Sequence, residues 1–133
     1  YTINKKNYAH IHFSNEVVPK NPFKRREYEK RKMELNKIAE DIKQNHPNTK
    51  RLISSTWIRN YKFYTDLFPK KYENGIRGRK DEGPTHMGYW GQFYRHDGTF
   101  NHRRAIQFRE NWKFPLKPLQ ATYKIDDFFK MYL

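Results

Sequence analysis

Alternation between apolar and polar positions is clearest near the start of the chain. In residues 8–13, Ala9, Ile11 and Phe13 alternate with more polar neighbours, which predicts a half-buried strand. Over residues 23–44 the apolar positions instead recur every three or four residues, and the other faces carry Lys and Glu. That spacing predicts a long amphipathic helix after the strand.

The middle of the chain predicts shorter elements. β-branched and small residues over 51–58 predict a second strand, and an apolar face over 61–68 predicts a helix of about two turns that ends at Pro69. Three glycines, a proline and a run of mixed charges then interrupt the pattern. We therefore expect a mobile loop over residues 73–85.

The last part of the chain returns to regular patterns. Residues 87–95 alternate well enough to predict a third strand, and Asp97-Gly98 is a turn dipeptide. A helix is expected over residues 101–111 and a final strand over 119–125, followed by a terminal helical turn. Strands that alternate with helices predict an α/β or α+β fold, with three to four helices packed on a small mixed sheet.

The length and aromatic content of the chain indicate what kind of core it forms. A chain of 133 residues supports a single domain spanning residues 1–133. Ten Phe, ten Tyr and three Trp make up 17% of the chain, and large rings can supply the buried area that few aliphatic residues provide. We therefore expect a folded domain with an aromatic core.

Charge and missing residue types narrow the functional classes. Lys and Arg number 28 against 14 Asp and Glu, a net charge of +14 whose field attracts polyanions of any kind. The absence of cysteine excludes disulfides, thiolate metal sites and a cysteine nucleophile. No apolar run is long enough to cross a membrane, so we expect no membrane partner. The cytoplasm is the default location. Because the chain opens on Tyr1 and not on Met, we expect processing or further residues before it.

Basic residues lie beside aromatic ones in several places, which is typical of nucleic-acid surfaces that pair cations with phosphates and rings with bases. The alternative is that these rings belong to the core and the charges solvate its outer face. Under the first interpretation the anion-binding cations are Arg59, Lys62, Lys70, Lys71, Arg77, Arg79 and Lys80. The stacking rings are Tyr61, Tyr72 and Tyr94.

Other motifs have less specific patterns. His10 and His12 share one strand face, a spacing that suits a metal or a phosphate, but no third ligand is evident and we predict no metal site. His96-Asp97 fits a turn better than a nuclease centre, and no sequence typical of a hydrolase surrounds Ser55. The sequence therefore assigns no catalytic residue.

Several segments together resemble a group of small uncharacterised bacterial proteins. They are Ser55-Thr56-Trp57-Ile58-Arg59-Asn60, Leu67-Phe68-Pro69-Lys70-Lys71-Tyr72, Trp90-Gly91-Gln92-Phe93 with Asp97-Gly98, and Phe114-Pro115-Leu116 leading to Ile125-Asp126-Asp127-Phe128-Phe129. The resemblance covers nearly the whole chain from His10 onward. It implies an ordered bacterial protein but brings no activity with it.

The first half of the chain also resembles, more distantly, the C-terminal GNAT-like domain of some acyltransferases, in which a strand, a helix and a Ser-Trp segment follow in the order of residues 10–13, 23–44 and 55–57. That resemblance implies an acyl-CoA ligand, with Ser55 or Tyr89 beside it. No glycine here satisfies the Q/R-x-x-G-x-G/A segment that holds the CoA pyrophosphate, so a degenerate half-domain fits as well as an enzyme.

The sequence is therefore compatible with three functions. The first is a non-enzymatic basic domain that binds an anionic partner such as nucleic acid. The second is an acyltransferase-like enzyme or its remnant, with acyl-CoA as its cofactor. The third is an interaction protein that docks on an acidic protein partner.

Overall fold

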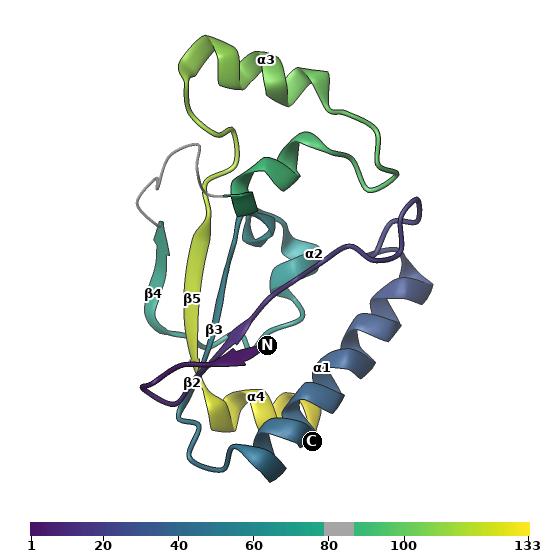
Figure 1. Ribbon diagram of the computed structural model, residues 1–133. Coiled ribbons are helices and arrows are strands. Elements are labelled where there is room, and N and C mark those ends of the chain that lie inside the picture. The colour runs from purple at the N-terminus through teal and green to yellow at the C-terminus, as the bar shows by residue number, and fades with distance from the viewer. Residues whose placement is uncertain (79–86) are drawn as a thin grey trace.

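The protein is an α/β fold built on one mixed sheet (Figure 1). The computed structural model describes residues 1–78 and 87–133. Along the chain the elements are β1 (Thr2–Ile3), β2 (Tyr8–Ile11), α1 (Arg25–Asn45), β3 (Arg51–Thr56), the 3₁₀ helix η1 (Trp57–Asn60), α2 (Lys62–Thr65), β4 (Glu73–Gly78), the 3₁₀ helix η2 (Met87–Phe93), α3 (His102–Asn111), β5 (Leu119–Lys124) and α4 (Ile125–Tyr132).

The sheet has five strands in the order β1-β2-β3-β5-β4. Strands β2 and β3 run parallel and are connected through α1, whereas the other neighbouring pairs are antiparallel. A parallel pair needs a long crossover, and the predicted helix between the two strands supplies it. Figure 1 shows α1 and α4 crossing near one end of the sheet, and α3 beyond the opposite end.

The two faces of the sheet have different environments because successive side chains point in opposite directions. Ala9, Ile11 and Leu52 are buried on the face that α1, α2 and α4 cover. From α1 the main core receives residues one helical turn apart, and it is completed by rings such as Phe68, Tyr123 and Phe128. The predicted amphipathic helix is thereby confirmed. Aromatic rings contribute to this core as predicted, but most of its buried members are aliphatic. His10 and Ser55 occupy the opposite face.

A second, smaller core lies in residues 87–118, which we call the aromatic lobe. Tyr89, Phe93 and Phe114 are its buried members, and Trp90, Ala105 and Phe108 pack against them. Phe114 lies 5.2 Å from Tyr89 and 5.0 Å from Phe108, measured between ring centroids. The lobe therefore joins η2, α3 and the segment that leads into β5 through aromatic contacts.

Two predicted elements differ from those observed. Residues 87–93 form the helix η2 and not a strand, because rings at 89, 90 and 93 share one helical face. The segment expected to be a mobile loop contains strand β4, which pairs with β5 and places the Glu73 carboxylate on the Arg51 guanidinium. The rest of that predicted loop, residues 79–86, lies outside the described residues.

Candidate functional site

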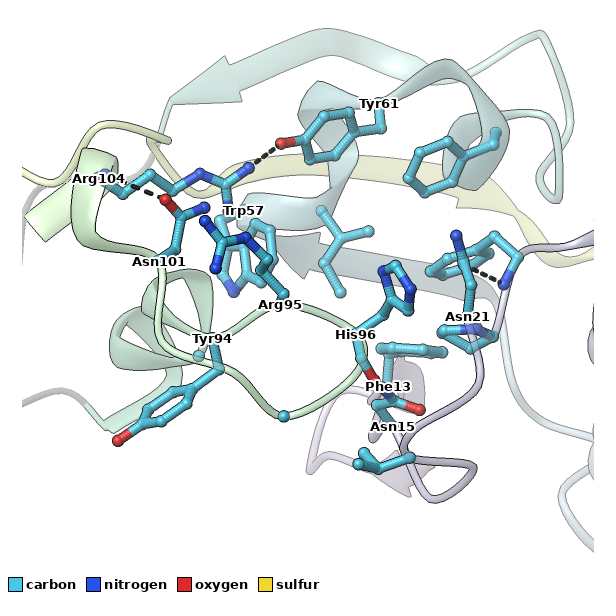
Figure 2. Close-up of a pocket in the computed structure, with 17 residues that line it drawn as sticks. Phe13, Asn15, Asn21, Trp57, Tyr61, Tyr94, Arg95, His96, Asn101 and Arg104 are labelled. Atoms are coloured by element: carbon cyan, nitrogen blue, oxygen red, sulfur yellow. Dashed lines mark hydrogen bonds between the residues drawn. The ribbon is translucent and has the colours of Figure 1, made fainter.

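A pocket of about 470 Å³ lies between the aromatic lobe and the main body of the protein (Figure 2). Three segments form it: the chain that leads from β2 to α1, the turn after β3 with η1 and α2, and the lobe from residue 91 to residue 104. It is lined by Phe13, Asn15, Val18, Asn21, Pro22, Phe23, Trp57, Ile58, Tyr61, Phe63, Gly91, Tyr94, Arg95, His96, Gly98, Asn101 and Arg104.

Aromatic rings in successive contact form one wall of this pocket. Phe13 stacks on Phe23 at 5.1 Å between centroids, and Phe23 lies 4.6 Å from Phe63. Phe63 in turn stacks on Tyr61 at 5.1 Å with only 7° between the ring planes, and Tyr61 meets Trp57 edge to face. Phe23 and Phe63 each pack against two other rings, so the ring faces that a planar ligand can reach are those at the two ends of the row, Phe13 and Tyr61.

The turn after β3 positions two of these rings. The Thr56 hydroxyl accepts a hydrogen bond from the Ile58 N–H at 3.3 Å and so caps η1, which begins at Trp57. Ile58 is buried in the main core and anchors the turn. The chain then enters α2 at once, which brings Tyr61 and Phe63 to the same side as Trp57.

Arg104, from the first turn of α3, forms part of the facing wall. Its Nη1 donates to the Gln92 carbonyl oxygen at 2.7 Å, and its Nη2 donates to the Tyr61 hydroxyl. The guanidinium carbon lies 5.7 Å from the centroid of the Trp57 ring, within the range of a cation–π contact. Arg104 thus connects the lobe to the aromatic wall and holds a positive charge at the pocket.

A tight turn carries the second arginine. The Arg95 N–H donates to the Thr99 carbonyl and the Gly98 N–H donates to the Arg95 carbonyl, while Gly98 adopts φ 85°, a conformation that favours glycine. Arg95 Nη1 donates to the Phe100 carbonyl at 2.9 Å. The predicted turn at Asp97-Gly98 is therefore confirmed, and it presents the exposed Arg95 side chain to the pocket.

The charged groups on the pocket wall are all basic within the part of the chain that the structure describes. They are Arg95, Arg104 and, when protonated, His96, and neither arginine forms an ion pair with a described carboxylate. Asp97 lies close by, and hydrogen bonds from the Thr99 hydroxyl and N–H hold its pKa below the usual range, helped by the charges of His96 and Arg95. Figure 2 shows Arg95 and Arg104 on the side of Trp57 and Tyr61, with His96 toward Phe13.

A second hollow of about 520 Å³ adjoins the first and shares the side chains of Phe13 and Trp57 with it. His10, His12, Ser55 and Tyr89 also line it. His10 Nε2 lies 3.0 Å from the Asn4 amide, and His12 Nε2 lies 3.0 Å from the Thr2 hydroxyl.

No group of three or more His, Asp or Glu side chains that could hold a metal ion occurs among the described residues.

The structure brings only some of the predicted anion-binding residues together. Tyr61 and Tyr94 both line the pocket, although the Tyr94 ring is 56% exposed and points away from its interior (Figure 2). Arg59 is only 4% exposed, and its guanidinium carbon lies 5.8 Å from the Phe68 ring and 5.7 Å from the Tyr123 ring. Burial between two core rings assigns Arg59 to packing and not to an open phosphate contact.

The other predicted residues lie elsewhere or outside the description. Lys62, Lys70 and Lys71 line a separate hollow near α4, where Lys62 pairs with Asp66 at 2.6 Å. Tyr72 is 40% exposed and sits edge-on to a core ring, Tyr123. Arg77 belongs to β4, but its side chain is not described, and the predicted residues Arg79 and Lys80 also lie outside the described residues.

Sequence reasoning missed the two pocket arginines and most of the aromatic wall. The signal was present around residue 95, where a basic residue follows Phe93-Tyr94 and precedes the turn. Phe13 and Phe23 carried no such signal, because their contact depends on how the chain between β2 and α1 folds back.

Comparison of the chain with protein-family models, with curated proteins and with solved structures found no match. The suggested resemblance to small bacterial proteins and to GNAT-like domains therefore stays a prediction. No helix in the described part of the chain is both long and apolar enough to cross a membrane.

Proposed function

We propose that this protein binds the nucleotide unit of an anionic ligand in the aromatic pocket, without catalysing a reaction. The observation that carries the proposal is the composition of the pocket: a wall of stacked rings faces arginines, and no described carboxylate lines it. A nucleotide is the common biological group that combines a planar ring with negative charge, so both halves of the pocket find a partner in one ligand.

The two walls contribute to binding in different ways. Stacking of a base on an aromatic side chain is worth about 1–3 kcal/mol. Phosphate oxygens accept charge-assisted hydrogen bonds from arginine, whose planar guanidinium suits them. Arg104 is held by Tyr61 and Gln92, whereas Arg95 is exposed on its turn and can reach a phosphate at the rim.

The charge of the whole chain supports the same proposal. A net charge of +14 raises the local concentration of anions and speeds their association, although it selects no particular one. Selection for a nucleotide comes from the rings and arginines of the pocket. Its volume of about 470 Å³ lies within the usual range for small-ligand sites. A flat acidic protein surface would use the charge but not the concave ring wall.

Calorimetric titration with AMP, adenosine and inorganic phosphate tests the proposal. We expect AMP to bind more tightly than either adenosine or phosphate alone, and its affinity to fall as salt rises from about 50 to about 200 mM. Arg95→Gln should weaken AMP binding about tenfold. Arg109→Gln is the matched control, because it makes the same change of charge at an exposed α3 position outside the pocket wall.

Two results would overturn the proposal. One is an absence of AMP binding at millimolar concentration and low salt, which would leave the positive charge to an acidic protein or another polyanion. The other is equal loss of AMP affinity in Arg95→Gln and Arg109→Gln, which would mean that only the overall charge matters.

A second candidate function, acyl-CoA binding, is favoured by the second hollow. Ser55 and Tyr89, the residues that the acyltransferase resemblance implies, both line that hollow, which adjoins the nucleotide pocket. CoA itself carries an adenine nucleotide, so the two sites could hold the two ends of one ligand. A ligand that binds only the native state raises Tm. Acetyl-CoA should therefore raise Tm more than equimolar AMP does, and an equal or smaller rise would argue against this candidate.

A further inference from the structure

The aromatic lobe carries four of the ten large apolar side chains that are exposed among the described residues. Tyr94 is 56% exposed, Phe100 41%, Ile106 53% and Trp112 77%. All four lie within a segment of 19 residues that runs from the rim of the pocket to the far end of α3. Exposed apolar side chains that gather in this way mark an interaction surface.

Trp112 is the clearest member of this group. It follows the last residue of α3 and has φ 53° and ψ 28°, the left-handed conformation that usually belongs to glycine at a helix end. Its one described ring contact is an edge-to-face approach to Phe108 at 6.0 Å between centroids. Packing gives little reason for a tryptophan in this strained and exposed position, which points to a functional role.

The same surface is basic. Residues 87–118 contain six Lys and Arg and two Asp and Glu, a net charge of +4 for the lobe. Arg103, Arg109 and Lys113 are all exposed on or just after α3, and Glu110 is the only acidic residue of that helix. None of the three cations takes part in an ion pair within the described residues.

The exposed rings continue from the nucleotide pocket. Tyr94 and Arg104 line the pocket, and the Tyr94 ring lies 5.8 Å from Phe100, which in turn lies 5.0 Å from His102 at the start of α3. The helix has ten residues and so extends for about 15 Å before Trp112. About four stacked nucleotides, at about 3.4 Å each, span that length.

We infer that the ligand of this protein is single-stranded nucleic acid, with one nucleotide in the pocket and the following ones along α3 as far as Trp112. The inference rests on the proposed function for its first nucleotide. Arg103, Arg109 and Lys113 contact the phosphates. Tyr94, Phe100 and Trp112 stack on bases. Rings can stack only on bases that are not enclosed in a duplex, so the surface favours a single strand.

Binding measured against ligand length tests the inference. Fluorescence anisotropy of labelled oligonucleotides with two, four, six and eight residues, at about 100 mM salt, should show affinity rising to a plateau near five or six. A duplex of the plateau length should bind at least tenfold more weakly than the single strand. Vesicles that contain anionic phosphatidylserine serve as the comparison for a membrane surface and should not compete.

Variants locate the contacts. Trp112→Gly removes the ring and relieves the left-handed backbone, so it should lower affinity for the six-residue strand about tenfold while Tm stays equal or rises. Trp112→Phe should recover most of that affinity. Arg109→Gln should reduce the slope of log affinity against log salt by about 0.7, the amount expected for one lost phosphate contact, while AMP binding stays unchanged. Lys43→Gln, at the far end of α1, is the control for charge.

The outcomes separate this inference from the proposed function. AMP binding with no gain on lengthening the strand would refute the inference and leave the nucleotide pocket in place. Equal affinity for duplex and single strand, or full affinity in Trp112→Gly, would also refute it. If AMP and the oligonucleotides all fail to bind, both proposals are wrong.

Discussion

Replacement of Gln92 tests most sharply what holds the pocket in shape. Gln92 is fully buried, and its side-chain amide makes three hydrogen bonds: Nε2 donates to the Tyr89 carbonyl at 3.0 Å and to the Leu116 carbonyl at 3.3 Å, and Oε1 accepts from the Leu116 N–H at 2.9 Å. The two bonds to Leu116 join η2 to the chain that enters β5, and the bond to Tyr89 lies within η2. The Gln92 carbonyl in turn accepts from Arg104, so the same residue supports the basic wall.

Gln92→Leu keeps nearly the same volume and removes all three bonds without opening a large cavity. At about 1 kcal/mol for each neutral bond, and more for a group left without water, we expect a loss of about 3 kcal/mol in the free energy of unfolding. For a chain of this size that corresponds to a fall of about 12 °C in Tm. Urea and thermal unfolding followed by tryptophan fluorescence measure both quantities.

A second glutamine variant serves as the control. Gln107→Leu makes the same chemical change at an exposed position of α3 and should shift the unfolding free energy by less than about 0.5 kcal/mol. If Gln92→Leu loses less than about 1 kcal/mol, the three bonds do not hold the lobe together, and the pocket between lobe and body would need another support.

Three further changes test the packing and the titration of the protein. Arg59→Met keeps a long side chain between Phe68 and Tyr123 and should raise the free energy of unfolding, measured by urea titration, by about 1 kcal/mol, because Nε and Nη1 of Arg59 are buried without a hydrogen-bond partner. A loss above about 2 kcal/mol would instead indicate an anionic partner. Trp112→Gly should gain about 0.5–1 kcal/mol in the same assay by relieving a left-handed backbone, and a loss would show that the indole packs on the lobe. The free energy of unfolding should fall as pH rises above about 10. Burial raises the pKa of several tyrosines in the folded protein, that of Tyr1 to about 12, so the tyrosines of the unfolded chain ionise first and favour unfolding. Equal stability in urea at pH 8 and pH 11 would contradict this prediction.

Local patterns predicted most of the fold. The strand at residues 8–11 and the helix that follows were evident because each has one buried face and a matching period. The strand at 51–56 was evident from its β-branched and small residues. A final strand was expected over residues 119–125 and is observed at 119–124. These elements depend on interactions that the local sequence largely encodes.

The errors came where distant contacts decide the structure. Residues 87–93 alternate as a strand would, yet their rings are drawn onto one helical face by Phe108 and Phe114, which lie far along the chain. Strand β4 was read as loop because its glycines suggested mobility, whereas pairing with β5 orders its backbone. Neither partner is visible in the local pattern.

The candidate site was predicted only in part for the same reason. Tyr61 was identified from its basic neighbours and does line the pocket, but Arg59 from the same segment turned inward onto Phe68 and Tyr123. Sequence spacing alone does not separate these two directions in a short 3₁₀ turn. Arg104 was missed because its role depends on the lobe folding back onto Trp57.

NMR can show whether the aromatic pocket binds a nucleotide. The three tryptophans give three indole N–H signals: Trp57 in the pocket wall, Trp90 in the core of the lobe and Trp112 at the far end of α3. Titration of the ¹⁵N-labelled protein with AMP should move the Trp57 signal most and leave that of Trp112 in place. An unchanged Trp57 signal at saturating AMP, or a larger movement of Trp112, would contradict the assignment of the pocket.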